Sequence, residues 1–496
     1  MKRSPHNFIT MKPTKSMKKN LLFLGTVLCL TAFSCVDGYH DNVVWSSSVH
    51  NITLESPAAD QITIQFSADG TGQTITWPLV TGAGGYRVTV YNVDDPVNPI
   101  LVGEENEVVD GVTTVRPATE DTRYKVVIKT LGNPKNNNLE AASSTEKLYD
   151  NLLPVTAVIP DGTNLKDYFT TNPIPSSATE LCYELVSGGT YTMSGNVSMG
   201  QTKVTIRGNK ISHPKITVTD GSFVNKGVGF KLKFIDLDYA NFTGGSTNAV
   251  ILMDVNFPTT GLSTTGYQVI PTSTPIAIQS CKITGLKYFL FYDSSKKYAI
   301  GSFLIKDCII GRNVNQTVAE IRFGAGIVKD LAITKSTIYS EVAAGSNRFC
   351  QIYAGAKVTD VKPATETWTS GSLTITNCTF YQSDKTSDSF NSNGALKQLG
   401  DKITIMNNIF VDSYNQYAIR RFRSSSNNPT FTGGYNSYWF DGNFPTTEET
   451  NAQGDNSGTI IKINPQLTYL GNAQFTLAGP DQIAARIGDP RWLPAL

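Results

Sequence analysis

Histidine is scarce in this chain and absent from its more regular part. Of the 496 residues only four are histidine, and the last of them is His213, after His6, His40 and His50. Histidine is the side chain that most often transfers protons near neutral pH, and it is a common zinc ligand. The sequence therefore argues against a histidine-dependent catalyst or a zinc site beyond residue 213, and we predict no metal site.

The chain also lacks an excess of charge of either sign. Lys and Arg total 42 and Asp and Glu total 41, which leaves a formal net charge of +1. Such a balance gives no broad positive field for nucleic acid, so we expect no nucleic-acid partner. No long helical pattern appears, whereas 41 glycines and many Ser, Thr and Asn residues suit short strands joined by turns. The composition predicts an all-β protein.

Cysteines are few, and their spacing does not suggest disulfides. Cys29 and Cys35 lie in the N-terminal segment, which leaves five cysteines, an odd number: Cys182, Cys281, Cys308, Cys350 and Cys378. Three of these occupy the same position of a repeated pattern, described below. They are therefore predicted to be buried thiols in an interior column rather than a disulfide framework.

The N-terminal segment reads as a targeting signal. Met17-Lys-Lys19 is basic, residues 21–30 are apolar, and residues 32–35 read Ala-Phe-Ser-Cys. The apolar run is too short to span a membrane as a helix. The cysteine after small residues resembles the lipidation signal of bacterial lipoproteins. That resemblance implies a signal peptide at 1–34, a lipid on Cys35, and an outer-membrane anchor facing the cell surface or the periplasm.

One eight-residue pattern recurs between residues 203 and 412. It consists of alternating apolar residues, an Asn- or Asp-like residue, a small residue, any residue and an apolar one. The six copies begin at Leu232, Ile276, Phe303, Leu331, Leu373 and Ile403. Steps between copies of roughly 26 to 30 residues, with longer steps before Ile276 and Leu373, indicate a solenoid, and the alternation indicates strands. Asn or Asp tolerates the left-handed backbone of a tight corner.

Coils stacked in register bring equivalent residues to about 4.8 Å from one another. One interior column is then expected to contain Cys281, Cys308, Ser336, Cys378 and Asn408. The pattern resembles the right-handed parallel β-helix of the pectate-lyase-like superfamily, and this is the predicted fold of residues 203–440.

Residues 51–150 have a different texture and are predicted to form a β-sandwich after a polar tether at 35–50. Trp77 and Tyr124 resemble the core Trp and corner Tyr of fibronectin type III modules, and we interpret both as packing residues. Residues 151–202 form a linker with a short helix, N-capped by Thr163, that closes the first end of the solenoid. Residues 441–496 are predicted to be a last coil and a closing cap.

The combination of lipid signal, fibronectin-like module and β-helix resembles lipoproteins of Bacteroidota glycan-utilisation systems whose β-helix has no assigned activity. In the pectate-lyase-like superfamily the ligand groove follows the strand that precedes the repeated pattern. Reading back one strand in each coil predicts an outward stripe of basic, amide and aromatic side chains. Its members are Arg322, Gln351, Tyr353, Lys397, Arg420, Arg421 and Arg423, with the phase of the last strand left open between Arg420 and Arg421.

Such a stripe suits an extended acidic polysaccharide such as pectin, because Arg and Lys pair with carboxylates and Tyr stacks on sugars. Basic residues that merely keep a strand soluble are the alternative. Hydrolysis needs paired carboxylates, and only Glu320 and Asp293 lie near. No ligand cluster for calcium is visible, so no cofactor is predicted.

Two other functions stay open. One is a polysaccharide lyase, with Lys397, Arg322 and Arg421 as candidate catalytic residues, although the ordinary pKa of Lys or Arg is high for a base. The other is a structural or adhesive surface protein that binds a protein partner. Our leading hypothesis is a non-catalytic or weakly catalytic glycan-binding lipoprotein.

Overall fold

The computed structural model describes residues 49–314, 319–342, 349–352, 357–383, 402–413, 430–450 and 454–495. The chain divides into two compact units between Asn151 and Leu152. Outside these ranges lie five predicted site residues, namely Tyr353, Lys397, Arg420, Arg421 and Arg423, and the predicted lipidation site Cys35.

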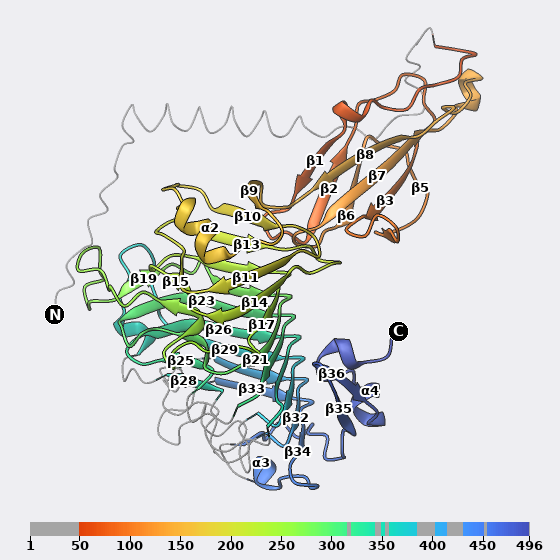
Figure 1. The fold of residues 1–496 in the computed structure, drawn as a ribbon. Helices are drawn as coiled ribbons and strands as arrows, with labels where there is room; N and C mark the ends of the chain where they lie inside the picture. Colours follow the sequence, from red (N-terminus) through yellow and green to blue (C-terminus); the bar gives the residue numbers. More distant parts are fainter. Residues whose placement is uncertain are drawn as a thin grey trace, which may run out of the picture. The chain divides into compact units, whose positions relative to one another are not determined.

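The first unit is a β-sandwich of two antiparallel sheets (Figure 1). One sheet has the order β1(Thr63–Phe66), β2(Gly72–Thr76), β6(Thr113–Pro117). In the other, β3(Tyr86–Asn92) pairs with β4(Ile100–Leu101), β5(Glu107–Val109) and β7(Arg123–Thr130), and β7 pairs with β8(Thr145–Asp150). Short 3₁₀ helices are formed by η1(Ala59–Gln61) and η2(Pro134–Asn136).

Trp77 and Tyr124 belong to the core of this sandwich. Both are buried, and the Trp77 ring lies 5.3 Å from the ring of Tyr86. The Tyr124 hydroxyl accepts a hydrogen bond from the Thr119 amide at 2.7 Å and donates one to the Thr119 carbonyl at 3.2 Å. This bond to the backbone just upstream is the arrangement of a tyrosine corner. Both residues therefore serve packing, while the likeness to a fibronectin type III module stays a prediction.

The second unit is built from three parallel sheets, which we name A, B and C. Sheet A contains β9(Val155–Ile159), β10(Leu181–Leu185), β13(Val204–Arg207), β16(Phe230–Lys233), β20(Ile276–Gln279), β23(Tyr298–Lys306), β26(Ile327–Thr334), β29(Ser372–Thr376), β31(Lys402–Met406) and β33(Thr430–Gly434), with β19(Gln268–Ile270) paired to the start of β23. Sheet B contains β11(Thr190–Ser194), β14(Lys215–Asp220), β17(Asp236–Asp238), β21(Lys282–Leu286), β24(Ile309–Arg312), β27(Thr337–Ser340), β30(Thr379–Tyr381), β32(Ile409–Val411) and β34(Ser437–Trp439). Sheet C contains β12(Val197–Ser198), β15(Phe223–Asn225), β18(Ala249–Met253), β22(Phe289–Tyr292), β25(Ile321–Phe323) and β28(Cys350–Ile352).

From β10 to β28 each coil runs from sheet A through sheet B to sheet C and then returns to sheet A one level further on (Figure 1). The predicted fold class is confirmed: the chain is all-β, and its larger part is a right-handed parallel β-helix. The first complete coil is β10, β11 and β12, so the solenoid begins before residue 203.

The corner between sheets A and B explains the repeated pattern. At each corner from β16 to β34 one residue has a left-handed backbone, with φ of 49° at Ser280, 57° at Asp307 and 58° at Asn407. From the Ser280 corner onward, the next residue points into the tube and its side chain hydrogen-bonds to backbone groups. Cys308 Sγ, for example, lies 3.3 Å from the Ile278 carbonyl. The predicted column of Cys281, Cys308, Ser336, Cys378 and Asn408 is confirmed, since all five are buried.

The first copy of the pattern begins at Phe230 and not, as the sequence suggested, at Leu232. Phe230 pairs with Ile276, and the left-handed corner residue is Phe234, with φ of 58°. Moving a strand by two residues leaves the same side chains facing inward. Alternation alone therefore could not fix this register.

Helix α2(Leu165–Thr171) covers the first coil. Leu165 and Phe169 are buried, and the Phe169 ring lies 5.1 Å from the Tyr183 ring. The N-cap is Asn164 rather than the predicted Thr163. The Asn164 side chain accepts hydrogen bonds from the Lys166 and Asp167 amides, whereas the Thr163 hydroxyl donates to the carbonyl of Pro160.

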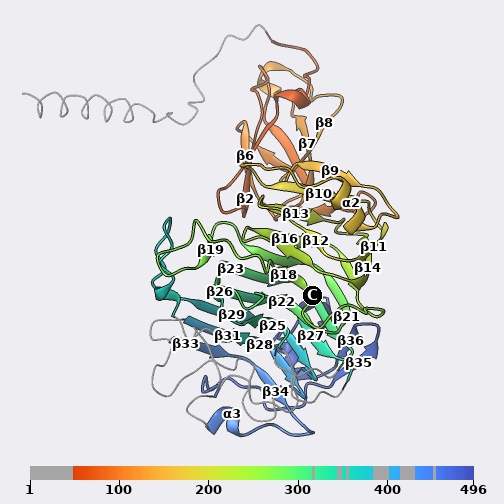
Figure 2. The ribbon, with the colours of Figure 1, turned by 60° about the vertical axis from the view of Figure 1, so that its left-hand side comes forward.

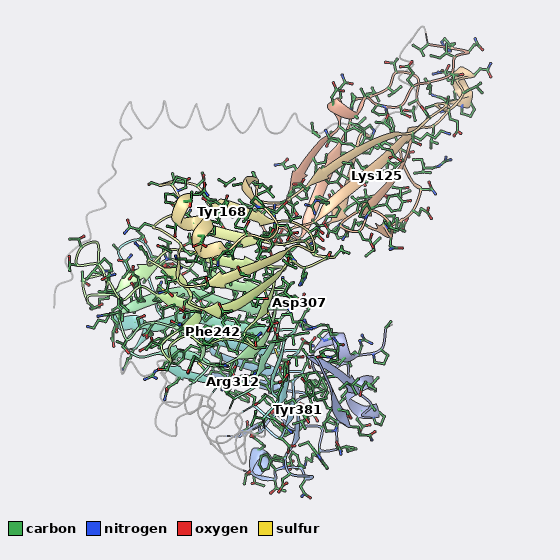
Figure 3. All side chains as sticks on the ribbon, in the orientation of Figure 1. Lys125, Tyr168, Phe242, Asp307, Arg312 and Tyr381 are labelled. Carbon is green, nitrogen blue, oxygen red and sulfur yellow. The ribbon has the colours of Figure 1, made fainter. Side chains whose placement is uncertain are left out.

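The C-terminal segment differs from the predicted closing cap. Its hairpin of β35(Leu467–Gly471) and β36(Gln474–Leu477), followed by α4(Pro480–Ala484) and η6(Pro490–Trp492), lies beside the coils (Figure 1). Phe475 packs against Tyr339 and Tyr381 of sheet B (Figure 3). The segment before this hairpin also packs onto the solenoid core. That segment includes α3(Thr447–Thr450), and its Phe444 and Ile460 contact the solenoid core.

Candidate ligand-binding face

The strands of sheet C present one column of side chains on their outer surface. Phe223, Ile251, Phe291, Ile321 and Cys350 are paired in register and buried in the tube. Their successors along each strand point the other way. This outer column contains Val224, Leu252, Tyr292, Arg322 and Gln351 (Figure 2, strands β18, β22, β25 and β28).

Arg322 lies over two aromatic rings, as strand pairing brings it beside the preceding coil. Its guanidinium carbon is 5.8 Å from the ring centre of Phe289 and 5.6 Å from that of Tyr292. These two rings are stacked, with their centres 4.6 Å apart. A guanidinium over aromatic faces is held by cation–π attraction. We call Phe289, Tyr292 and Arg322 the arginine platform.

Toward the first coils the outer surface of sheet C is apolar. Ala249, Leu252 and Phe289 form a cluster of their own, and Val224, Tyr288 and Tyr292 pack against it. Beside this cluster the rings of Phe242 and Tyr288 lie with their centres 6.1 Å apart (Figure 3 labels Phe242). In the described part of the outer column, Arg322 is the basic residue, so the stripe is less basic there than the sequence suggested.

The two predicted site residues that the structure describes, Arg322 and Gln351, differ in their exposure to solvent. Arg322 is half-buried and lies in the outer column, as its phase predicted. Gln351 pairs with Arg322 and shares its side of the sheet, but its side chain is only 3% exposed. The expectation that Gln351 offers an open amide to a ligand is therefore wrong. Alternation along a strand predicts on which face of the sheet a side chain lies. It does not predict whether neighbouring segments cover that side chain.

Asp293 follows β22 and is fully buried. Its carboxylate accepts hydrogen bonds from the amides of Ser295, Gly324, Ala325 and Gly326 at 2.6 to 3.0 Å. Burial raises the pKa of the Asp293 carboxyl, and these four bonds act in the opposite direction. The carboxylate thus binds the turn that follows Arg322 and does not reach the outer surface.

Glu320 is also inside the tube. It is 1% exposed, and its Oε1 lies 3.3 Å from Nη1 of Arg312, which is equally enclosed (Figure 3 labels Arg312). Burial raises the pKa of Glu320 to about 7, while the Arg312 charge works against this rise. Neither Asp293 nor Glu320 presents the exposed carboxylate that a hydrolytic mechanism requires.

Two long loops pack together at the edge where sheet C leads to sheet A. Thr272, between β18 and β20, donates from its amide to Glu366 at 3.0 Å and from its hydroxyl at 2.5 Å. Thr265 donates to the carbonyl of Val361, which lies after η3(Val358–Asp360). The loops are anchored because Val358, Val361 and Trp368 are buried in the solenoid core. These hydrogen bonds therefore join the two loops to each other.

Among the described residues, no three His, Cys, Asp or Glu side chains gather closely enough to hold a metal ion. Within the same residues, none of the helices combines the length and the apolar character needed to cross a bilayer.

Sequence reasoning missed Asp293 as a structural residue of this face. A signal was present in retrospect: an aspartate directly after one strand, and Gly324-Ala-Gly326 directly after the strand of the next coil. A buried carboxylate readily accepts several amides of such a turn, because glycines let the backbone approach closely.

Comparison with known proteins gives three family matches along the chain. Residues 3–188 match DUF4992, residues 189–341 match DUF4957 and residues 373–492 match DUF5123, each described as a domain of unknown function. The chain has no match among curated proteins. Among solved structures, the PL6-family alginate lyase AlyGC is similar, with 14% identity and a TM-score of 0.30. The match covers 63% of this chain and 41% of the lyase, so the chain spans about two fifths of that enzyme's length.

Proposed function

We propose that this chain is a lipid-anchored protein of the bacterial envelope that binds an acidic polysaccharide along the outer face of sheet C. The observation that carries the proposal is the arginine platform, in which the Arg322 guanidinium lies 5.6 Å from the Tyr292 ring centre on an outward column. A guanidinium pairs with a uronate carboxylate, and an aromatic ring offers a face to the sugar.

Geometry of the solenoid supports an extended ligand. The coils repeat at about 4.8 Å, and the outer column continues over at least the coils of β15, β18, β22, β25 and β28. A polymer lying across the strands would meet the partly exposed members of the column, which come from different coils. Val224 and Tyr292 would then contact apolar parts of the sugars, and Arg322 would contact a carboxylate.

Binding is preferred over cleavage because the described carboxylates near the face, Asp293 and Glu320, are both buried and engaged. The lyase alternative depends on Lys397 and Arg421, which lie outside the described residues. Unsaturated products that absorb ultraviolet light after incubation with uronate polymers would establish a lyase and displace the binding proposal.

The experiment is affinity electrophoresis on gels containing polygalacturonate, alginate or a neutral glucan. The wild-type chain should be retarded by a uronate polymer and not by the glucan. Arg322→Ala should weaken retardation about tenfold or more, because the charge-assisted bond from the guanidinium to a uronate carboxylate is lost. Lys306→Ala, an exposed cation at the end of β23 in sheet A, is the matched control and should bind normally. No retardation on any uronate polymer would refute the proposal.

A further inference from the structure

Asp293 connects the coil of Tyr292 to the coil of Arg322. Its amide donates to the Arg322 carbonyl at 3.2 Å. Its carboxylate Oδ1 accepts from Gly324 at 2.8 Å, and Oδ2 accepts from Ala325 at 3.0 Å and from Gly326 at 2.6 Å. The backbone on the C-terminal side of Arg322 is therefore held by one residue of the preceding coil.

The turn at residues 324–326 leaves no room for a side chain at either of its two glycines. A Cβ added at Gly324 would lie 2.5 Å from the Ser295 hydroxyl. One added at Gly326 would lie 2.5 Å from the Tyr298 carbonyl and 2.9 Å from Asp293 Oδ2. The amides can surround the carboxylate only because these two positions carry no side chain.

Tyr292 precedes Asp293 in the chain, and Arg322 lies two residues before Gly324. Strand pairing sets Tyr292 opposite Arg322, and the Asp293 contacts lie immediately beyond that pair. A binding group keeps its geometry when the residues behind it are themselves fixed. The separation between the Arg322 guanidinium and the Tyr292 ring thus depends on the turn and on Asp293.

We propose that Asp293 is the positioning residue of the arginine platform: it holds the 324–326 turn so that Arg322 stays over Phe289 and Tyr292. As far as a glycan is concerned, this inference rests on the proposed function. The part that concerns the turn stands on the hydrogen bonds alone.

The test compares Asp293→Asn with Asp489→Asn in the full chain. Both aspartates are buried and accept at least one backbone N–H, but the Asp489 carboxylate accepts from the Arg491 amide and from the Thr337 hydroxyl on β27 of sheet B. An asparagine at 293 turns an amide group toward N–H donors that need an acceptor. We expect faster hydrogen exchange in a peptide covering 322–327 and at least tenfold weaker binding of de-esterified oligogalacturonate. Asp489→Asn should change neither quantity.

A double variant separates positioning from a general loss of stability. If Asp293 acts through Arg322, then Arg322→Ala with Asp293→Asn should bind no more weakly than Arg322→Ala alone. Additive losses, or equal losses of binding in Asp293→Asn and Asp489→Asn, would overturn the inference. Should Asp293→Asn fail to fold, Gly324→Ala perturbs the same turn more gently, because the added Cβ first meets the movable Ser295 hydroxyl, and it should raise exchange and weaken binding together.

The two proposals fail differently. If the wild-type chain binds no uronate polymer but Asp293→Asn exchanges faster at 322–327, the proposed function is refuted and the role of Asp293 in the turn is kept. If the wild type binds and Asp293→Asn binds equally well, the positioning role is refuted and the proposed function is kept.

Discussion

At the scale of single residues, the solenoid encloses polar groups that need partners. The Glu320–Arg312 pair is the clearest case, because both side chains are at most 2% exposed. A buried ion pair rarely adds net stability, yet removing one partner is costly since it leaves a charge without compensation. Burial has raised the pKa of Glu320 to about 7 from its ordinary 4.5.

This pKa predicts a pH dependence of stability. A carboxyl whose pKa is higher in the folded state binds more protons when folded, so stability is greatest below its ordinary pKa and falls as the pH rises from about 4.5 to about 7. Glu320→Gln should abolish this fall, which amounts to about 3 kcal/mol at most. Thermal denaturation at pH 5 and pH 8 measures it, with the exposed Glu341→Gln as control. An unchanged pH profile in Glu320→Gln would show that Glu320 is charged throughout.

The interior column gives a second residue-scale prediction. Asn408 accepts a hydrogen bond from the Cys378 amide at 2.9 Å and donates to the Ile375 carbonyl at 2.9 Å. Asn408→Ala leaves both buried groups unpaired, so the free energy of unfolding should fall by about 2 to 4 kcal/mol. Denaturation followed by circular dichroism tests this. Asn377→Ala, at the neighbouring left-handed position, probes backbone strain instead and should cost less.

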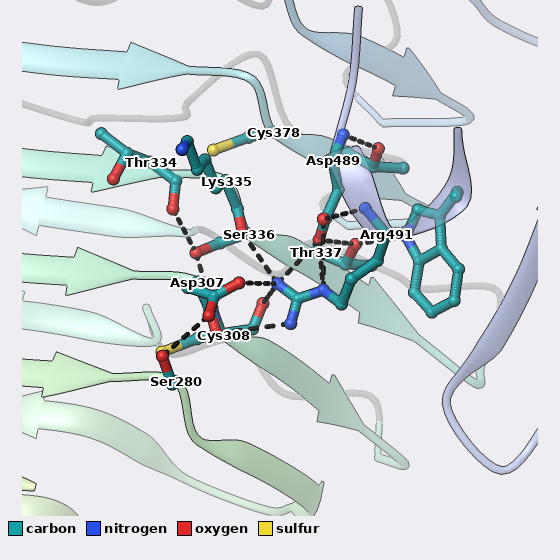
Figure 4. Close-up of polar contacts among 12 residues, drawn as sticks. Ser280, Asp307, Cys308, Thr334, Lys335, Ser336, Thr337, Cys378, Asp489 and Arg491 are labelled. Atoms are coloured by element: carbon teal, nitrogen blue, oxygen red, sulfur yellow. Dashed lines mark hydrogen bonds and ion pairs between the residues drawn. The ribbon is translucent and has the colours of Figure 1, made fainter. Parts of the chain in front are cut away.

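At the scale of elements, Asp489 and Arg491 near the end of the chain form polar contacts with several coils, and we call these two residues the clasp (Figure 4). Arg491 donates to the carbonyls of Cys308 and Lys335 at 3.0 and 2.7 Å and pairs with Asp489 at 3.0 Å. The Asp489 carboxylate accepts from the Thr337 hydroxyl at 2.7 Å. Burial raises the pKa of Asp489 to about 6, and Arg491 opposes that rise. Arg491 thereby contacts the corners of two consecutive coils, at Cys308 and Lys335, more than 150 residues earlier in the chain.

Arg491→Ala should destabilise the β-helix by about 3 kcal/mol, because it leaves Asp489 buried without its cation. The melting temperature should fall, and proteolysis should release the segment after residue 466 more readily. Arg486→Ala removes only an exposed contact to the Pro494 carbonyl and should have little effect. Since the clasp lies on sheet B, retardation by uronate polymers should persist in Arg491→Ala; its loss would contradict the separation of clasp and binding face.

At the scale of the whole molecule, the proposed function predicts two properties that no single contact determines. Binding of an acidic polymer by cationic side chains must weaken as salt screens the charges, on a length of about 10 Å at 0.1 M. Retardation on polygalacturonate should therefore decline between 50 and 500 mM salt. Retardation that does not change with salt would indicate sugar stacking without carboxylate pairing.

The lipid anchor is the other whole-molecule prediction. Wild-type chain expressed in a bacterial host should fractionate with membranes and incorporate labelled palmitate. Cys35→Ala should abolish the label, because the lipid is attached to the thiol, whereas Cys29→Ala should retain it. Labelling that survives Cys35→Ala would disprove Cys35 as the lipidation site.

The sequence alone determined the coil and its corners. Each coil repeats the same local pattern of alternating apolar residues, a left-handed corner and a small buried residue. Because every copy indicates the same geometry, the column through Cys308 and Asn408 could be predicted. The outward phase of Arg322 followed from alternation as well. Other features depend on contacts between coils, and only the tertiary structure decided them. The register at Phe230 is one such feature, because a slip of two residues leaves every side chain on the same face of the sheet. The burial of Gln351 depends on the segments around it. Asp293 accepts hydrogen bonds from amides 31 to 33 residues further along the chain. Alternation has a period of two along one strand, and it carries no information about which residue of the next coil lies alongside.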